Sequence, residues 1–215
     1  MATEHGKYIV IEGSDGTGKS TQVAYLRERL AADGIDSVEF HEPEGTPIAN
    51  QIREIIKDGT LERDPMTNLL LFTAARHEIW KTARHHLSNG TWVVAARNYF
   101  STVAYQGYGQ GVSHDLITET TRTFTDELYT KPDLAVILTL NDETERLRRI
   151  QERGELEKPD TFESMNSDFQ TRVNLGYAHL AEELSLPTIY AEQSPEKIAE
   201  EIYTLIRQKG LFAAI

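Results

Sequence analysis

The residue types and spacing most able to do chemistry lie in one loop near the start of the chain. Residues 13–20 follow the pattern G-x-x-x-x-G-K-S, whose glycines allow backbone angles and close approaches that a Cβ atom would block. Backbone N–H groups of such a loop, together with the start of a following helix, point at an anion. Lys19 can reach the β- and γ-phosphates of a nucleotide, and the Ser20 hydroxyl can bind Mg²⁺.

The residues on either side of this loop supply the strand and the helix that the pattern requires. Residues 8–11 read Y-I-V-I, a β-prone run, and a helix with a buried stripe at Val23, Leu26 and Leu30 begins inside the loop. This context disfavours the alternative, an accidental glycine-rich turn. The predicted nucleotide phosphate site comprises Gly13, Ser14, Asp15, Gly16, Thr17, Gly18, Lys19, Ser20 and Thr21.

Apolar runs and helical patterns then alternate along the 215 residues. Helices are predicted from the loop to Gly34, from Pro47, over 65–87, within 113–128, over 143–152, over about 162–184 and from 195 to near 210. Strands are predicted at 8–11, 38–40, 92–96, 134–140 and 188–190. This order predicts a single α/β domain, in which a five-stranded parallel sheet is covered by helices on both faces.

Polar residues follow the ends of three predicted strands, at positions 11, 40 and 96. In a parallel α/β sheet, ligands bind at the carboxyl ends of the strands. Arg97 comes directly after a buried apolar strand, where a charged group is costly unless it meets an anion. We therefore expect Arg97 to lie in the same site as the glycine-rich loop.

Composition narrows the class of partner. With 39% apolar and 26% charged residues the chain is typical of a globular protein, and its net charge of −12 argues against a nucleic-acid polymer as partner. A basic cleft in such an acidic body would suit a small anionic substrate. The chain contains no cysteine, and no apolar run approaches the roughly 20 residues that would span a membrane. We expect a cytoplasmic enzyme.

Several segments together make the chain similar to the thymidylate kinases. Residues 41–46 (H-E-P-E-G-T) resemble the family's R-E-P-G-G-T, and residues 71–76 (L-F-T-A-A-R) resemble its L-F-x-A-D-R helix. Residues 101–107 (S-T-V-A-Y-Q-G) resemble the end of its D-R-Y-x-x-S-x-x-A-Y-Q-G segment, and residues 153–158 (R-G-E-L-E-K) resemble the R-G-E-L-D-R lid of the bacterial type. The resemblance extends over nearly the whole chain.

This resemblance implies the three-layer fold of P-loop NTPases and the ATP-dependent phosphorylation of dTMP to dTDP. Arg53 would hold the monophosphate, Phe72 would stack on the thymine, and Arg76 would hydrogen-bond its carbonyl edge. Arg97 would bridge the donor and acceptor phosphates, while Tyr105 would lie under the deoxyribose. The implied substrate site comprises Glu42, Pro43, Arg53, Phe72, Arg76, Arg97, Ser101, Thr102, Tyr105 and Gln106.

The resemblance also implies a lid over residues 149–162 and a homodimer. Because Gly16 stands where one subgroup of the family has arginine, the lid would supply the catalytic cation, and Arg153 is the candidate beside Lys19 and Arg97. Arg149 would contact ATP, and Ser20 with Asp15 would hold Mg²⁺.

Some residues leave alternatives open. Phe72 and Tyr105 could be core aromatic residues, and the basic residues near 149–158 could form a solvated helix face. Alanines at 75 and 96 replace family aspartates. The family's carboxylate at position 96 helps to organise Mg²⁺, so Asp15, Glu42 and Glu44 are the candidates to replace it. The seven histidines show no metal spacing. Two rival functions remain: a nucleoside monophosphate kinase with shifted pyrimidine specificity, and a nucleotide-binding protein with little activity.

Overall fold

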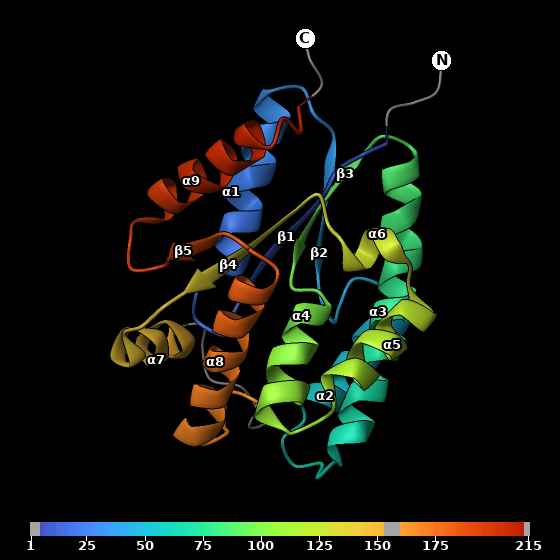
Figure 1. The fold of residues 1–215 in the computed structure, drawn as a ribbon, viewed down its shortest axis with the longest axis vertical. Coiled ribbons are helices and arrows are strands. Elements are labelled where there is room, and N and C mark those ends of the chain that lie inside the picture. Colours follow the sequence, from blue (N-terminus) through green and yellow to red (C-terminus); the bar gives the residue numbers. More distant parts are fainter. Residues whose placement is uncertain (1–4, 153–159, 213–215) are drawn as a thin grey trace.

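The structure is a computed structural model and describes residues 5–152 and 160–212. At its centre lies a sheet of five parallel strands in the order β2-β3-β1-β4-β5 (Figure 1). All five predicted strands are confirmed, and three of them differ from the prediction by one or two residues at an end. The strands are β1 (Tyr8–Gly13), β2 (Ser37–His41), β3 (Trp92–Ala96), β4 (Leu134–Thr139) and β5 (Thr188–Tyr190).

Helices occupy most of the chain between the strands. They are α1 (Lys19–Ala32), α2 (Pro47–Lys57), α3 (Pro65–Ser88), α4 (Tyr99–Thr102), the π-helix η1 (Val103–Gly109), α5 (His114–Phe124), α6 (Glu127–Thr130), α7 (Glu143–Gln151), α8 (Ser167–Glu183) and α9 (Pro195–Gln208).

Both faces of the sheet are buried, because helices cover each of them. Tyr8 and Val10 of β1 point into a core shared with α3, η1 and α8, whereas Ile9 and Ile11 point into a core shared with α1 and α9. Alternate residues of one strand therefore enter opposite cores, as expected for a central parallel strand. The predicted three-layer α/β arrangement is confirmed.

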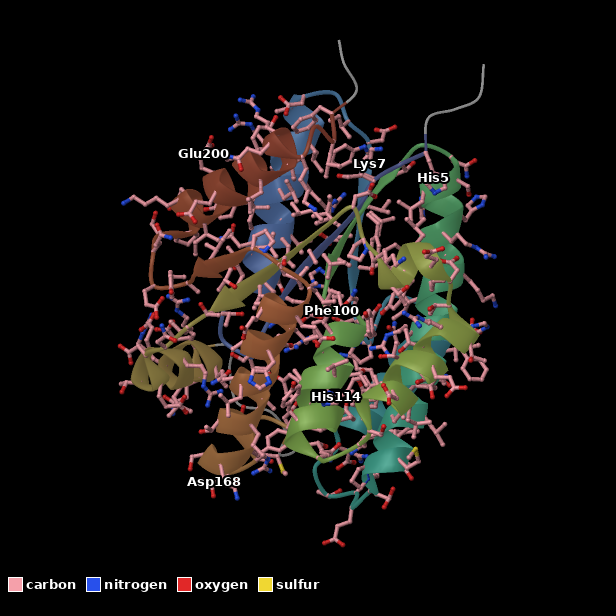
Figure 2. The ribbon with its side chains drawn as sticks, viewed as in Figure 1. His5, Lys7, Phe100, His114, Asp168 and Glu200 are labelled. Carbon is pink, nitrogen blue, oxygen red and sulfur yellow. The ribbon has the colours of Figure 1, made fainter. Side chains whose placement is uncertain are left out.

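Side chains fill the spaces between these layers. Figure 2 shows Phe100 in the interior beside the sheet, while Asp168 of α8 and Glu200 of α9 extend from the surface of the molecule. Within residues 5–152 and 160–212, no helix is long and apolar enough to cross a membrane.

Two predicted helix boundaries were wrong, and local capping explains both. The helix predicted to start near 162 begins at Ser167, because Asn166 caps it and Asp160 instead accepts hydrogen bonds from the backbone N–H groups of Phe162 and Glu163. The segment predicted as helical within 113–128 is divided into α5 and α6, where Asp126 caps the second helix.

The segment after β3, for which no secondary structure was predicted from the sequence, is helical. It passes from α4 into η1, a rare helix type that is frequent at functional sites. Gly109 at the end of η1 packs so close to α8 that an added Cβ would lie 2.6 Å from Cε2 of Phe169. Tyr105 of η1 also packs on α8, with its ring centroid 6.2 Å from that of Phe169 and 6.4 Å from that of Tyr177.

Candidate functional site

A cleft opens where the carboxyl ends of β1, β2 and β3 meet. Its walls come from the glycine-rich loop, the β2–α2 loop, α2, α3 and the segment after β3. The cleft brings together residues predicted from separate motifs: Asp15, Gly18, Lys19, Ser20, Thr21, Glu42, Pro43, Arg53, Phe72, Arg97, Ser101, Thr102, Tyr105 and Gln106.

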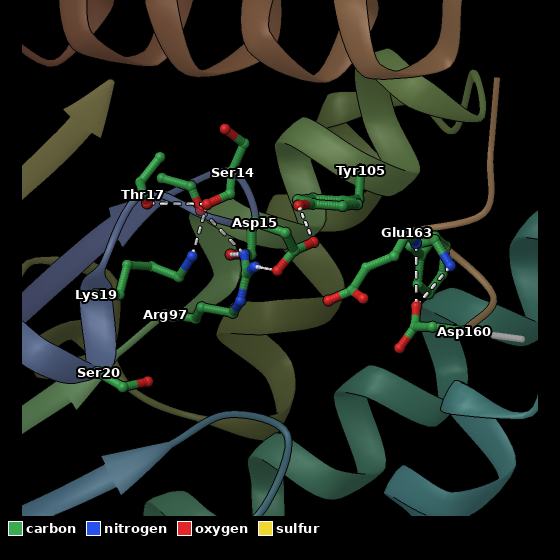
Figure 3. Close-up of polar contacts among 12 residues, drawn as sticks. Ser14, Asp15, Thr17, Lys19, Ser20, Arg97, Tyr105, Asp160 and Glu163 are labelled. Carbon is green, nitrogen blue, oxygen red and sulfur yellow. Dashed lines mark hydrogen bonds and ion pairs between the residues drawn. The ribbon is translucent and has the colours of Figure 1, made fainter. Parts of the chain in front are cut away.

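The glycine-rich loop has the geometry of an anion cradle. An added Cβ at Gly13, whose φ is +139°, would lie 2.3 Å from the Leu138 carbonyl oxygen, while Gly18 at φ +89° turns the chain into α1. Lys19 Nζ donates to the Ser14 carbonyl oxygen at 2.8 Å, and the Thr17 hydroxyl donates to the same oxygen at 2.9 Å (Figure 3). The N–H groups at the N-terminus of α1 therefore lie close to the ammonium group of Lys19. Together they form a positively polarised site that can bind a nucleotide phosphate.

Asp15 joins the loop to the segment after β3. Its Oδ1 lies 2.6 Å from Arg97 Nη2, and its Oδ2 accepts a hydrogen bond of 2.8 Å from the Tyr105 hydroxyl (Figure 3). Burial lowers the pKa of Arg97, but Asp15, Tyr105, Tyr177 and Glu12 together outweigh burial and hold that pKa well above its ordinary value. Burial, followed by the charge of Asp15, raises the pKa of the Tyr105 phenol. Arg97 is thus a cation and Tyr105 a neutral donor at physiological pH.

Arg97 lies in the left-handed backbone region, with φ of 74°. A non-glycine residue held in such a region is strained by about 1–3 kcal/mol and persists only where its surroundings determine it. Its Nη1 also donates to the Ser101 hydroxyl at 2.9 Å and to the Tyr177 hydroxyl at 3.1 Å. The arginine expected between two phosphates is therefore held in one position by a strained turn and several partners.

Glu12 is the residue that sequence reasoning missed and that organises this turn. It is fully buried, and its two oxygens accept hydrogen bonds from the backbone N–H groups of Gly13, Asn98 and Ser101 and from the hydroxyls of Ser101 and Tyr177. The available signal was a carboxylate inside an otherwise apolar strand, which requires partners.

Arg76 lies behind the wall of the cleft. Its Nε donates to Glu42 Oε2 at 3.0 Å and its Nη2 donates to the Thr102 hydroxyl at 3.0 Å, while Tyr129 donates to Glu42 Oε1 at 2.7 Å. Burial raises the pKa of Glu42, and the nearby Arg76 opposes that shift. Among the described residues nothing accepts a hydrogen bond from the buried Nη1 of Arg76. The Nη1 group of Arg76 is therefore a donor beside the cleft that could hydrogen-bond a ligand.

Aromatic side chains form the end of the cleft between α3 and α8. Phe72 is half-buried, and its ring centroid lies 5.9 Å from that of Phe162, which in turn lies 5.8 Å from Tyr105. Phe162 was predicted as the end of the lid and the start of a helix, with no role in the site. Figure 3 shows the carboxylate of Glu163, another residue that sequence reasoning did not select, directed toward Asp15 and Tyr105.

Two of the arginines near the glycine-rich loop and the predicted lid can be placed. Arg149 lies outside the cleft, where it contacts Glu145 at 2.7 Å and the Ala191 carbonyl oxygen at 3.0 Å. Arg146, which was not predicted, packs on the glycine-rich loop, and an added Cβ at Gly16 would lie 3.0 Å from its Cγ. Arg153 lies outside the described residues.

Three positions at which the chain differs from the family motifs, namely 41, 75 and 96, lie in or near the cleft or in the core. Ala96 lines the cleft and Ala75 is buried in the core. His41, given no role from the sequence, also lines the cleft, and its Nδ1 lies 3.5 Å from the Ser20 hydroxyl.

The donor set of the cleft fits a nucleotide with Mg²⁺. Within residues 5–152 and 160–212, no three His, Cys, Asp or Glu side chains are grouped to hold a metal. However, Mg²⁺ takes only one or two protein oxygen ligands when it is bound together with phosphates and water. The Ser20 hydroxyl and the carboxylates of Asp15, Glu42 and Glu44 all line the cleft and offer such oxygens.

The parallel sheet, the phosphate-binding loop and the cleft at the strand ends, which contains Lys19, Arg53 and Arg97, define a P-loop nucleotide-binding protein of the kinase type. Comparison with known proteins narrows this class, because the family model described as "Thymidylate kinase" matches residues 11–202. The chain belongs to the thymidylate kinase family.

Individual relatives agree over nearly their whole length. The chain is 35% identical over 207 residues to a thymidylate kinase of Chlorobaculum parvum, covering 93% of this chain and 94% of that one. It is 34% identical over 198 residues to one of Carboxydothermus hydrogenoformans, covering 92% and 95%. It is 34% identical over 208 residues to one of Deinococcus radiodurans, covering 95% and 98%.

Proposed function

We propose that this chain transfers the γ-phosphoryl group of ATP to dTMP, giving dTDP and ADP. The observation that carries the proposal is the family match over residues 11–202, together with a cleft that joins the phosphate loop to Arg53, Phe72 and Arg97. The reaction breaks the bond between the γ-phosphorus and the β–γ bridging oxygen and forms a bond to an oxygen of the dTMP phosphate. That acceptor oxygen is already anionic at neutral pH, so no side chain has to act as a general base.

Phosphoryl transfer depends mainly on positioning and on neutralising charge. Lys19 neutralises charge on the donor phosphates, and Arg97 lies between the donor and acceptor phosphates. Mg²⁺, when bound, adds positive charge on the donor phosphates, and Ser20 with Asp15 would hold it. One carboxylate oxygen of Asp15 contacts Arg97 and the other accepts a hydrogen bond from Tyr105. To bind Mg²⁺, Asp15 must therefore share its oxygens with the metal or give up one of these partners.

The acceptor nucleoside lies in the aromatic end of the cleft in this proposal. Phe72 stacks on the thymine, and the spare Nη1 of Arg76 donates to a base carbonyl; among the described residues it has no other acceptor. Tyr105 and Gln106 contact the sugar, and Arg53 holds the phosphate. The whole chain acts as one nucleoside monophosphate kinase domain, with Arg149 and Arg153 in a lid over residues 149–162.

A coupled assay of ADP release tests this function against its rivals. The panel contains dTMP, dUMP, dCMP and the ribonucleotide of thymine, each with ATP and Mg²⁺. We expect dTMP to give the highest kcat/KM. A higher value for another pyrimidine would support the kinase of shifted specificity, and turnover near background for all four would support the nucleotide-binding protein with little activity.

Replacing Phe72 with alanine tests the stacking role. We expect dTMP binding to weaken by about 1–3 kcal/mol, the range for loss of one base–aromatic stack, while ATP binding changes little. Isothermal titration with each nucleotide measures both effects. Phe124→Ala, which removes an exposed ring on α5 outside the cleft, serves as the control. Equal losses for dTMP and ATP in Phe72→Ala would assign Phe72 a structural role only.

We also propose a homodimer that acts in the cytoplasm. Two neighbouring helices, α2 and α3, carry the exposed apolar side chains of Ile48, Ile55 and Leu70. We propose that a second copy of the chain packs on this apolar surface. The absence of cysteine in the sequence is compatible with a reducing compartment.

Sedimentation equilibrium tests the dimer. The wild-type chain is expected at twice its monomer mass, and Leu70→Glu is expected to shift the population toward monomer, because burying an unpaired carboxylate at an interface is unfavourable. Leu184→Glu, which alters an exposed leucine after α8, is the control and should stay dimeric. A monomeric wild-type chain would contradict the proposal.

A further inference from the structure

Arg53, the residue proposed to hold the acceptor phosphate, already contacts a carboxylate inside the cleft. Its Nε lies 2.9 Å from Glu44 Oε2, and both residues line the cleft. A second carboxylate, Glu54 of α2, is more distant, with 3.6 Å between its Oε1 and Arg53 Nη1. An anion that binds Arg53 must therefore displace Glu44 or share the guanidinium with it.

The β2–α2 loop holds Glu44 in this position. The backbone N–H of Glu44 donates to the His41 carbonyl oxygen at 2.7 Å, and that of Gly45 donates to Asn50 Oδ1 at 3.0 Å. The Thr46 hydroxyl then caps α2, the helix that carries Arg53.

Among the four cleft carboxylates with described ion pairs, Glu44 is the most exposed. The side chains of Glu42 and Asp160 are each 5% exposed in their contacts with Arg76 and Lys57, and that of Asp15 is 19% exposed beside Arg97. The side chain of Glu44 is 43% exposed, and that of its partner Arg53 is 29% exposed. Solvent can therefore take up the Glu44 carboxylate when another anion replaces it.

We propose that Glu44 determines the affinity of the cleft for the acceptor's phosphate by competing with that phosphate for Arg53. This inference rests on the proposed role of Arg53 as the acceptor-phosphate residue. In the empty cleft Glu44 neutralises Arg53, and on binding the nucleotide's phosphate replaces the carboxylate. Glu44 thus weakens the binding of dTMP through its phosphate alone and leaves the binding of an uncharged nucleoside unaffected.

The test compares single variants by isothermal titration with dTMP, thymidine and ATP. For Glu44→Gln we expect the Kd for dTMP to fall roughly two- to fivefold, the factor that corresponds to one partly exposed ion pair. The Kd values for thymidine and ATP should not change. The gain should shrink at high salt, because salt screens exposed charges. In steady-state kinetics, the KM for dTMP should fall while the KM for ATP stays constant.

Glu54→Gln is the matched control, because it removes the same charge from the same region but lies farther from Arg53. It should leave the Kd for dTMP nearly unchanged. Arg53→Gln should weaken dTMP binding, and adding Glu44→Gln to that variant should give no further gain, because the competition needs the guanidinium.

Several outcomes would overturn the inference. They are an unchanged or higher Kd for dTMP in Glu44→Gln, an equal gain for thymidine, an equal gain in Glu54→Gln, or a gain that survives in the absence of Arg53. Failure of the proposed function would appear differently, as a wild-type chain that does not phosphorylate dTMP.

Discussion

Replacing Lys19 with alanine is expected to lower the turnover of dTMP by on the order of 10²–10³-fold or more, the loss seen when one preorganised donor is removed from a transition state. The reason is its position: Lys19 lies at the start of α1 with its ammonium 2.8 Å from the Ser14 carbonyl oxygen, inside the phosphate loop. The fold should survive, because within the described chain Lys19 belongs to the cleft and to neither apolar core.

The measurement is steady-state turnover together with the midpoint of thermal unfolding. Lys131→Ala is the matched control, because it also removes one lysine charge, but from an exposed pair with Glu127 far from the loop in the sequence. We expect its turnover to equal that of the wild type. A folded Lys19→Ala variant with near-normal turnover would show that the phosphate loop is not the catalytic site.

Replacing Glu12 with alanine is expected to affect both stability and turnover. Its carboxylate accepts hydrogen bonds from Gly13, Asn98, Ser101 and Tyr177. Removing the carboxylate would leave these buried donors without an acceptor. Each such group costs about 1–3 kcal/mol, so we expect the free energy of unfolding to fall by on the order of 3 kcal/mol after partial relaxation. A displacement of Arg97 by about 1 Å would lower turnover by on the order of 10²-fold.

Urea unfolding and steady-state kinetics measure the two effects of Glu12. Glu12→Gln should lie between the wild type and Glu12→Ala, because glutamine keeps one acceptor oxygen and the Ser101 and Tyr177 hydroxyls can reorient. Glu39→Ala, an exposed glutamate on β2 paired with Arg27, is the control. If Glu12→Ala changed stability by no more than the control, within about 0.5 kcal/mol, Glu12 would not support the turn.

The fold followed from the sequence to a large extent, because the signals that define it are local. The strand at 92–96 and the strand at 188–190 were predicted with the bounds that the structure shows. Thr46 before Pro47 marked the start of α2 through a cap that needs only neighbouring residues. The α8 boundary was missed because Asp160 and Asn166 compete as caps, and the choice between them depends on Asp160 also pairing with Lys57 of α2.

Many residues that line the cleft were selected from the sequence, but the contacts between them were not predicted. The glycine-rich loop and the resemblance identified Lys19, Arg53, Phe72 and Arg97, all of which line one cleft. The sequence did not indicate that Asp15 contacts Arg97 and Tyr105, or that Glu44 contacts Arg53. Side-chain partners of this kind depend on which rotamers the packed elements allow.

The sequence by itself therefore determined the phosphate-binding loop, the order of strands and helices and the family. Only the tertiary structure decided how Glu12 holds the Arg97 turn and how Arg146 packs on Gly16. It also decided which carboxylate pairs with each arginine of the cleft. The physical reason is that backbone periodicity and capping are set within a few residues, whereas a buried polar group takes partners from any part of the chain. Glu12, for example, accepts a hydrogen bond from Tyr177, which is 165 positions away.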